Sequence, residues 1–303
     1  MMSIGRIATG FQAQQSNQWL QQSQITLNRL QEKASLGKNI VRASDDPLGL
    51  TQLMTITRSM NEDEQYIKNI NTGISELQST DAAITQMIEI VQRASELGTQ
   101  GANVTTGAAG MATLGKEVDL LINQMVQLGN FQLGDNYLFG GVITNTPPFS
   151  RALDVVTYSG TPNTQAFQRE VDISKQASLT INIGGDTLLG DTTAGIFKTL
   201  VGLKNALNAG NTTLTRDKLD LLKTDLGNLL ASQATMGATL NQLNSTLERT
   251  QTRQESSSQL YGEIQNVDLP ELVTNLRFQE QVNEASLGVM ARILPQSLFN
   301  FLR

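Results

Sequence analysis

One heptad repeat constrains this sequence most: in a helix expected from about Asp45 to Gly98, it runs from Leu53 to Gly98 without an internal proline. Stepping alternately by three and four residues gives an almost wholly apolar series, broken by two aspartates and two small residues at its end: Leu53, Ile56, Met60, Asp63, Ile67, Ile70, Ile74, Leu77, Asp81, Ile84, Ile88, Val91, Ser95, Gly98. Such a seam is typical of a coiled coil or a bundle of long helices. At about 1.5 Å per residue the helix is roughly 75–80 Å long. Because a rod of that length cannot bury its stripe alone, other segments must supply its partners.

Three further helices are predicted as those partners. A second very long helix begins near Thr213, with its own heptad leucines at Leu219, Leu222, Leu226, Leu229, Leu240, Leu243 and Leu247. A shorter helix carries apolar residues from Met111 to Leu128, and another, starting near Thr193, carries them from Ile196 to Leu207. The sequence therefore predicts a long-helix bundle domain built from residues 44–141 and 193–265, with the helix after Gly110 antiparallel to the first.

The stretch between the bundle segments has a different character. Short β-prone runs at 137–139, 155–158, 167–173 and 179–183 are separated by Gly-Gly, Pro-Pro and Thr-Pro-Asn turns. We expect residues 142–192 to form a small β-rich insert domain. The fold class is thus mainly α with a β-rich insert.

The two ends of the chain are predicted to be paired terminal helices, residues 1–43 and 266–303, which are disordered in the isolated monomer. The first is rich in Gln and Asn with few apolar positions, and such a helix is marginal without packing. The second starts at an Asp268 cap, and Pro295 is expected to interrupt or kink it. We expect the apolar residues of both ends to form an assembly surface: Leu20, Leu27, Leu30, Val41, Leu287, Met290, Leu294, Leu298, Phe299, Phe301 and Leu302.

A hinge joins the first terminal helix to the long helix. Gly37 lies near its start, and Ser44, Asp45 or Asp46 can cap the long helix, with Pro47 in the first turn. Two carboxylates also suit the positive end of the helix dipole. A divalent metal at the aspartates has too few ligands to be preferred, so we expect a capping site without a cofactor.

Composition excludes several functions. The chain has no Cys and no His, which removes cysteine nucleophiles, Ser-His-Asp catalysis and the usual zinc sites. Its net charge of −6 argues against a nucleic-acid partner. No apolar run is long enough for a membrane span, and the first twenty residues lack the apolar core of a cleavable signal. We expect a protein that is not an enzyme.

Two sets of residues give the sequence a resemblance to a known family. The hinge, Ser35-Leu36-Gly37-Lys38-Asn39-Ile40 followed by Ser44-Asp45-Asp46-Pro47-Leu48-Gly49, is similar to the "SSG-x-x-I…ADDAAGL" motif of the bacterial flagellin superfamily. Ala34 and Ser35 depart slightly from the double-Ser form of that motif. The carboxyl end, Leu294-Pro295-Gln296-Ser297-Leu298, resembles the family's terminal ending. The likeness covers about 1–141 and 215–303. Pro47 after the aspartates, and Tyr137-Leu138-Phe139-Gly140-Gly141 followed by Pro148-Phe149, resemble the members at the junction between hook and filament.

The resemblance implies a structural role in the bacterial flagellum. Such a protein is exported unfolded by the flagellar type III apparatus, with an export chaperone covering its apolar end. It then folds outside the cell and self-associates in a ring or helical layer between hook-associated protein 1 and flagellin, at the hook–filament junction. Its terminal helices would line the inner tube and its insert would face outward. It would have no cofactor and no membrane or nucleic-acid partner.

Three other readings remain open on the residues. A minor flagellin of the filament itself would share the same motifs. A secreted coiled-coil adaptor or effector would share the heptads but would not need two sparse helices at opposite ends of the chain. An enzyme is the third alternative, and it would depend on a carboxylate-based hydrolase site in the β-rich insert.

Overall fold

The structure is a computed structural model, which describes the backbone of residues 3–103, 106–162 and 168–301. The side chains of residues 3–10, 12–13 and 292–301 lie outside that description. The chain divides into two compact units, and each is described here by itself. Unit 1 consists of residues 1–62 and 254–303, and unit 2 of residues 63–253. The sequence predicted boundaries at 43/44 and 265/266 instead.

Two long helices carry the predicted seams. Helix α2 spans Pro47–Gly101 and α6 spans Thr212–Gln265. Every residue of the predicted α2 seam from Leu53 to Gly98 is buried or partly buried, and so are the seam leucines of α6. In unit 2 the two helices are antiparallel, since Gly73 packs on Leu243 whereas Gly98 packs on Leu219. The predicted pairing of the two long helices is therefore confirmed.

Both aspartates of the α2 seam bind polar side chains of α6. The buried Asp63 carboxylate accepts two hydrogen bonds from Arg253 Nε, at 3.0 and 2.9 Å. Further along, Gln233 Nε2 donates to Asp81 Oδ1 at 3.1 Å. The residue numbers of the two pairs sum to nearly the same value, as one antiparallel register requires. A polar residue in an apolar seam specifies register at some cost in stability.

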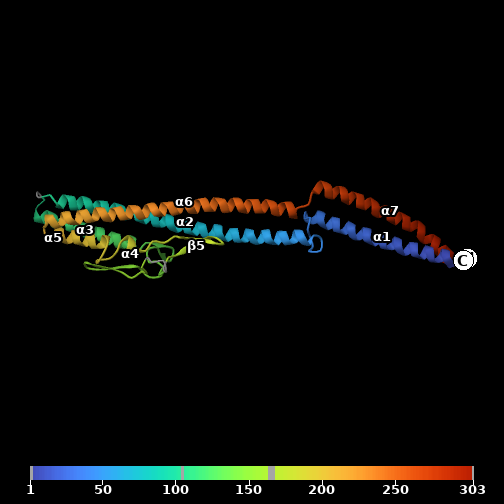
Figure 1. The fold of residues 1–303 in the computed structure, drawn as a ribbon, viewed down its shortest axis with the longest axis horizontal. Coiled ribbons are helices and arrows are strands. Elements are labelled where there is room, and N and C mark those ends of the chain that lie inside the picture. Colours follow the sequence, from blue (N-terminus) through green and yellow to red (C-terminus); the bar gives the residue numbers. More distant parts are fainter. Residues whose placement is uncertain (1–2, 104–105, 163–167, 302–303) are drawn as a thin grey trace. The chain divides into compact units, whose positions relative to one another are not determined.

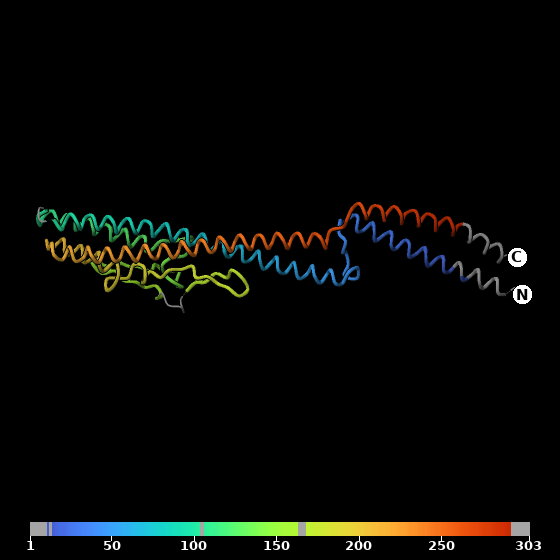
Figure 2. Tube along the Cα trace, turned by 45° about the horizontal axis from the view of Figure 1, so that its top comes forward, coloured from blue at the N-terminus to red at the C-terminus, as the bar shows by residue number. Residues whose placement is uncertain are grey.

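Two shorter helices complete the bundle of unit 2. Helix α3 (Gly107–Gly129) and α5 (Ile196–Asn208) contact each other and run beside α2 and α6 in both ribbon and tube (Figures 1 and 2). The predicted apolar faces are buried, including Val118 and Ile122 on α3 and Leu200 and Leu203 on α5. Helix α5 starts at Ile196, not near Thr193. Asp191 Oδ1 accepts the backbone N–H groups of Thr193 and Ala194 at 2.7 and 3.1 Å, which holds those residues in a turn.

The β region contains three two-stranded antiparallel sheets within the described residues. They pair β1 (Gln132–Leu133) with β2 (Asn136–Tyr137), β3 (Phe149–Ala152) with β4 (Val155–Tyr158), and β5 (Glu170–Ser174) with β6 (Ala177–Thr180). A short helix, α4 (Gly185–Leu188), follows. The predicted strand at 155–158 is confirmed. Of the run 137–139, Tyr137 alone is in a strand, because Leu138 and Phe139 turn into the core, where they are fully buried.

The β region shares the core of the bundle. Phe149 is buried, with its ring centroid 5.1 Å from that of Tyr158 and 5.3 Å from that of Phe197 on α5. The Asn130 side chain donates to Phe149 O at 2.8 Å and accepts from Phe149 N at 2.9 Å, which fixes β3 to the end of α3. The described residues of 142–192 therefore pack on the bundle and contribute to its core.

Unit 1 pairs the two ends of the chain. Helix α1 (Ser3–Leu36) and α7 (Leu269–Phe301) run side by side in both views (Figures 1 and 2). They are antiparallel, since Gln279 Nε2 donates to Ser23 Oγ at 2.9 Å while Lys38 pairs with Asn266. Pro295 was expected to interrupt or kink the last helix, and the predicted interruption is wrong. A proline removes one backbone hydrogen bond and clashes with the preceding turn, yet α7 continues through it to Phe301.

Candidate assembly site: the hinge and the paired terminal helices

The hinge begins where α1 ends. Gly37 has φ +66° and donates its N–H to Lys33 O at 2.8 Å. A left-handed residue just after the last turn is the common way to end a helix, and glycine adopts it without a steric penalty. Gly37 therefore fixes the direction in which the chain leaves α1.

Two chain segments that are far apart in sequence pair at the hinge. Asn39 N donates to Gln265 O at 2.7 Å, and Val267 N donates to Gly37 O at 3.2 Å. The buried Gln265 side chain donates to Ile40 O at 3.1 Å. The link from α1 to α2 is thus bonded to the link from α6 to α7. Gln265 was not singled out from the sequence, where a glutamine among many others carries no signal.

Three residues were candidates for the cap of α2, and the structure separates their roles. Asp46 Oδ1 accepts Gly49 N–H at 2.9 Å, and Leu50 N donates to Asp46 O at 3.0 Å, so Asp46 is the N-cap. Pro47 is the first residue of the helix. Ser44 is exposed.

Asp45 binds backbone N–H groups that precede it in the chain, whereas Asp46 binds one that follows it. Asp45 Oδ2 accepts the backbone N–H of Arg42 at 2.9 Å and that of Val41 at 3.3 Å. These hydrogen bonds, Arg42 first, lower the pKa of Asp45 below its usual range. Because the folded-state pKa is lowered, this contribution to stability is present above the ordinary pKa of an aspartate and is lost as the pH falls through the lowered value.

The predicted assembly leucines of α1 lie on the face that pairs with α7. Leu20, Leu27 and Leu30 are half-buried. On α7, Leu272 and Met290 are buried, and Leu30 and Leu272 line one groove of about 450 Å³ beside the hinge. Val41 is half-buried in the hinge, and Leu287 is 46% exposed. The predicted assembly surface also includes five residues whose side chains lie outside the described part of the structure: Leu294, Leu298, Phe299, Phe301 and Leu302.

Other apolar side chains of unit 1 face solvent, and sequence reasoning did not assign them to the surface. At about 100° per residue, Phe11, Ile25 and Leu36 lie on the side of α1 opposite Leu20 and Leu27. On α7 the buried stripe has an exposed apolar flank on either side. Besides the predicted Leu287, the exposed large apolar residues among the described side chains of α1 and α7 are Phe11, Trp19, Ile25, Leu36, Leu269, Val273, Phe278 and Val289.

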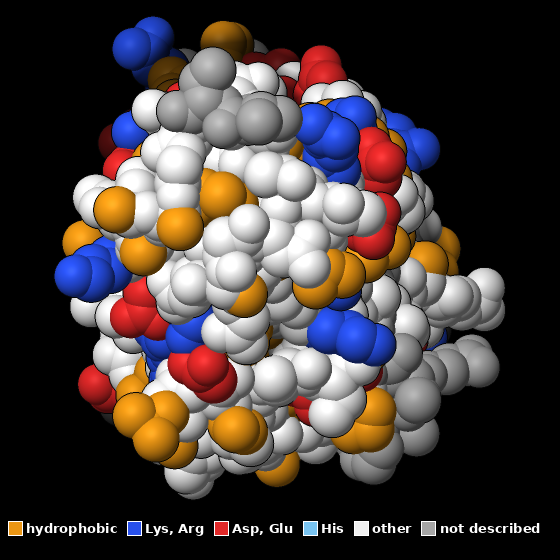
Figure 3. Space-filling model, turned by 90° about the vertical axis from the view of Figure 1, so that its left-hand side faces the viewer, with side chains coloured by type: hydrophobic (Ala, Val, Ile, Leu, Met, Phe, Trp, Pro, Cys, Tyr) orange, Lys and Arg blue, Asp and Glu red, His pale blue; other side chains and the backbone are white. Residues whose placement is uncertain are grey.

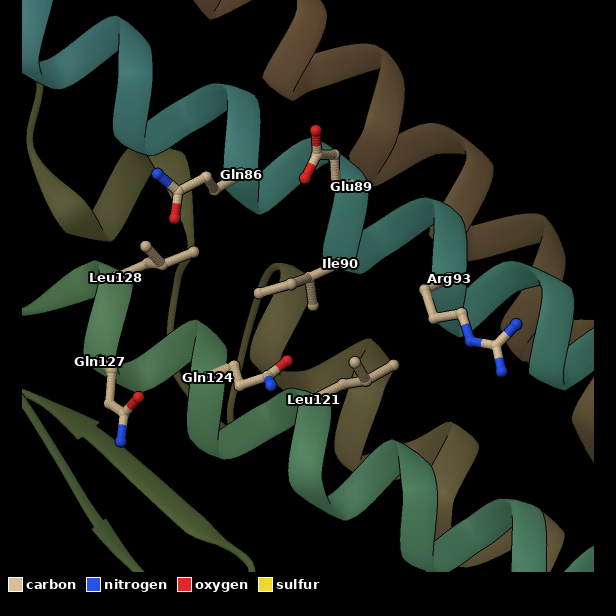
Figure 4. Close-up of a pocket in the computed structure, with 8 residues that line it drawn as sticks. All are labelled: Gln86, Glu89, Ile90, Arg93, Leu121, Gln124, Gln127 and Leu128. Atoms are coloured by element: carbon tan, nitrogen blue, oxygen red, sulfur yellow. The ribbon is translucent and has the colours of Figure 1, made fainter.

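Two grooves of unit 2 are lined by apolar, amide and charged side chains. The first, about 460 Å³, lies between α2 and α3, with Ile90, Leu121 and Gln124 between the two helices (Figure 4). Its charged residues are Glu89 and Arg93, and Arg93 donates to Glu117 on α3 and to Glu96. Among the described residues, no group of three or more His, Cys, Asp or Glu side chains is arranged to hold a metal ion.

Two other classes of site concern nucleic acids and membranes. Side chains of Lys and Arg are interspersed with those of Asp and Glu on the face shown in Figure 3, so that face has no basic patch. Within the part of the chain that the structure describes, no helix is long and apolar enough to cross a membrane. Fold and site define a long-helix structural protein with an antiparallel terminal helix pair.

The chain belongs to the bacterial flagellin family. Residues 7–144 match the bacterial flagellin N-terminal helical region, and residues 219–302 match the bacterial flagellin C-terminal helical region. The chain is 24% identical to flagellar hook-associated protein 3 of Escherichia coli, over 97% of this chain and 98% of that protein. It is 25% identical to flagellin of Bacillus subtilis, over 92% of this chain and 96% of that protein.

Solved structures share the fold. Flagellar hook-associated protein 3 of Legionella pneumophila superimposes with a TM-score of 0.63 at 16% identity, covering 70% of this chain and 98% of that one. The FlgL structure of Bacillus cereus gives a TM-score of 0.59 at 21% identity, covering 69% and 99%. At these identities the likeness carries the fold alone.

Proposed function

We propose that this protein is a structural component of the bacterial flagellum and forms the layer at the hook–filament junction, between hook-associated protein 1 and flagellin. End-to-end similarity to a hook-associated protein 3 supports the proposal, because it spans both terminal regions and the β region together. Pro47 after the two aspartates, as the first residue of α2, agrees with it.

The observation that carries the proposal is the apolar surface of the paired terminal helices. Phe11, Trp19 and Phe278 are each about two-thirds exposed. Leaving such side chains in water is unfavourable, since full burial of each would contribute roughly 1.5–3 kcal/mol. An assembly that surrounds the helix pair with neighbouring subunits removes this surface from water, and an export chaperone would cover it earlier.

This function needs binding surfaces and no chemistry. We infer that the protein is not an enzyme, binds no cofactor and acts outside the cell in a ring or helical layer of its own copies. The three-domain division, with bundle 44–141 and 193–265 and insert 142–192, belongs to the same proposal. So do the assembly leucines and the hinge residues Gly37 and Asp46.

Electron microscopy of isolated hooks tests the location. Antibody against this chain should label the distal end of the hook in one narrow band. A strain lacking the gene should build hooks but release flagellin into the medium. Label spread along the filament, or normal filaments in the deletion strain, would contradict the junction role.

A minor flagellin of the filament is the alternative, and similarity to Bacillus subtilis flagellin over most of both chains favours it. A filament protein polymerises by itself into long fibres, whereas a junction protein stops after a layer. Seeding purified protein on isolated hooks and measuring fibre length distinguishes the two. A secreted coiled-coil adaptor would form neither fibres nor a layer on the hooks.

The first prediction concerns Trp19, the single tryptophan of the chain. Because its side chain is 66% exposed, Trp19→Ala should change the free energy of unfolding by less than about 0.5 kcal/mol, while it lowers incorporation into hooks. Urea unfolding and quantitative immunoblots of isolated hooks measure the two effects. In the native protein the Trp19 emission should shift to shorter wavelength on assembly. Full incorporation of the variant would contradict an assembly role for this face.

A further inference from the structure

A second groove of unit 2 combines exposed apolar side chains with an unpaired cation. It lies between α3, the β3–β4 turn and α5, with a volume of about 500 Å³. Leu120 on α3 is 62% exposed and Leu153 in the turn is 90% exposed, and Val155 beside the turn is 51% exposed. A cluster of this kind on one side of a folded unit marks an interaction surface more often than scattered single residues do.

The backbone conformation of Leu153 also indicates an interaction surface. Leu153 and Asp154 form a two-residue turn between the paired Ala152 and Val155, and Leu153 has φ +55°. Glycine, asparagine and aspartate are the residues that such turns favour. A leucine there is strained, and with its side chain almost fully in solvent it gains little from its own chain. Contact with another molecule would give this side chain a role.

The charged residues at the floor of the groove form ion pairs with one another and so neutralise their charges. Lys204 is buried and Arg151 is partly buried. Arg151 pairs with Asp119, and Lys204 pairs with Asp119, at 3.4 Å, and with Asp154. These contacts fix the turn to α3 and α5, and the hydrogen bonds and nearby positive charge of Arg151 and Lys204 lower the pKa of Asp119 despite its partial burial. The floor is therefore a rigid support and leaves little charge for a partner.

The rim of the groove carries the positive charge of Lys116. Lys116, one turn before Leu120 on α3, is exposed and has no ion pair among the described residues. The groove thus presents leucines with one cation beside them. A partner that fits offers apolar side chains with a carboxylate between them.

We propose that the occupant is a second copy of this chain, bound through the outer stripe of α6. Leu214 and Leu221 lie seven residues apart on one side of that helix, 47% and 49% exposed, and the exposed Asp217 lies between them. Asp217 would face Lys116, and the two leucines would pack on Leu120 and Leu153. The contact is heterologous, joining different surfaces of successive copies, as a ring or helical layer requires. The inference rests on the proposed self-association.

Cysteine cross-linking tests the contact directly, because the native chain contains no cysteine. A strain producing one copy with Leu153→Cys and another with Leu221→Cys is grown, and its isolated hooks are oxidised. The matched control replaces Leu221→Cys by Leu230→Cys, since Leu230 is 48% exposed but about half a helical turn away in direction. A disulfide needs Cα atoms within about 7 Å, so the 153–221 pair should give at least about tenfold more dimer than the 153–230 pair.

A charge exchange gives a second readout that does not depend on the cysteines. Lys116→Glu and Asp217→Lys should each lower incorporation into hooks, and the two together should restore it. Three results would overturn the contact: equal cross-linking of the two pairs, dimer formed by Leu221→Cys with Leu133→Cys at the end of β1 in place of Leu153→Cys, or a double charge variant no better than the single ones.

The same samples separate this inference from the proposed function. If immunoblots find the protein in hooks but the 153–221 dimer is missing, the contact is wrong and the junction role stands. If the protein is absent from hooks, the junction role fails. The oxidation is then repeated on the purified full chain at high concentration, where dimer or its absence decides the contact.

Discussion

At the scale of single residues, the two aspartates of the hinge accept hydrogen bonds from different backbone N–H groups. Asp46 caps α2 through Gly49 N–H, and Asp45 holds the preceding turn through Arg42 N–H. The two carboxylates stand next to each other in sequence but stabilise different pieces of backbone. Their effects on stability should therefore be separable.

Asp46→Ala should lower the free energy of unfolding by about 0.5–2 kcal/mol, because the cap is lost and an N–H group of the first turn is left without its acceptor. Ser44→Ala is the matched control and should stay within about 0.5 kcal/mol, since Ser44 is exposed. Urea titration with circular dichroism measures both. A chelator should leave both curves unchanged, and a shift on adding one would indicate a metal at the aspartates.

Gly49 should not tolerate alanine, although alanine normally favours helices. A Cβ there would lie 2.6 Å from Ile40 Cδ1, in the buried corner where the hinge meets α2. Gly227 in α6 has nothing within 4 Å of such an atom. Gly227→Ala should therefore stabilise by about 0.5–1 kcal/mol, whereas Gly49→Ala should destabilise. Equal gains from both substitutions in thermal unfolding would mean that the corner has room.

At the scale of elements, the seam between α2 and α6 specifies both a partner and a register. Its leucines and isoleucines would pack nearly as well after a shift of one heptad. The Asp63–Arg253 and Asp81–Gln233 pairs would not, because a shift would leave a buried carboxylate without its donors. The polar interruptions of the seam thus select one alignment.

Arg253→Ala should lower the free energy of unfolding by about 1–3 kcal/mol, because the buried Asp63 loses its donors. Replacing all four polar residues with leucine should instead keep or raise stability but weaken the register. Spin labels at Thr72→Cys and Asn244→Cys, both exposed in unit 2, report the alignment. We expect one narrow distance distribution in the native background and a broad or multiple one in the leucine variant. A narrow distribution in both would assign the register to the apolar side chains alone.

At the scale of the whole molecule, stability is distributed unevenly between the two units. Unit 2 contains the continuous apolar core, to which α2, α3, α5, α6 and the β region all contribute. Unit 1 contains long helices joined along single stripes, with large apolar side chains facing solvent on their other sides. Such segments open at lower free energy than a packed core.

Limited proteolysis of the dilute monomer should trim α1 and α7 and leave a resistant fragment near residues 44–265, because α2 and α6 continue from unit 1 into the core of unit 2. Mass spectrometry of the fragment locates its ends. Cleavage near residues 62 and 253 would place the boundary where the contacts of the structure divide the chain. Protection of the first forty residues would contradict disordered ends.

The sequence by itself determined the helices and the faces they bury. Heptad spacing is a local property of the chain, so it predicts which side of α2 and α6 is apolar before any partner is known. The same holds for the helix start at Pro47, where one or two residues fix the local backbone.

The sequence predicted which helices are partners, but tertiary structure alone decided the individual contacts between distant segments. Nothing local pairs Gln265 with Ile40 or brings Phe149 against Phe197, because each contact depends on where distant segments lie. It also turned Trp19 and Phe278 outward. A helix with apolar residues on two sides buries just the side for which its own chain offers a partner, and the other side is left for a neighbouring molecule.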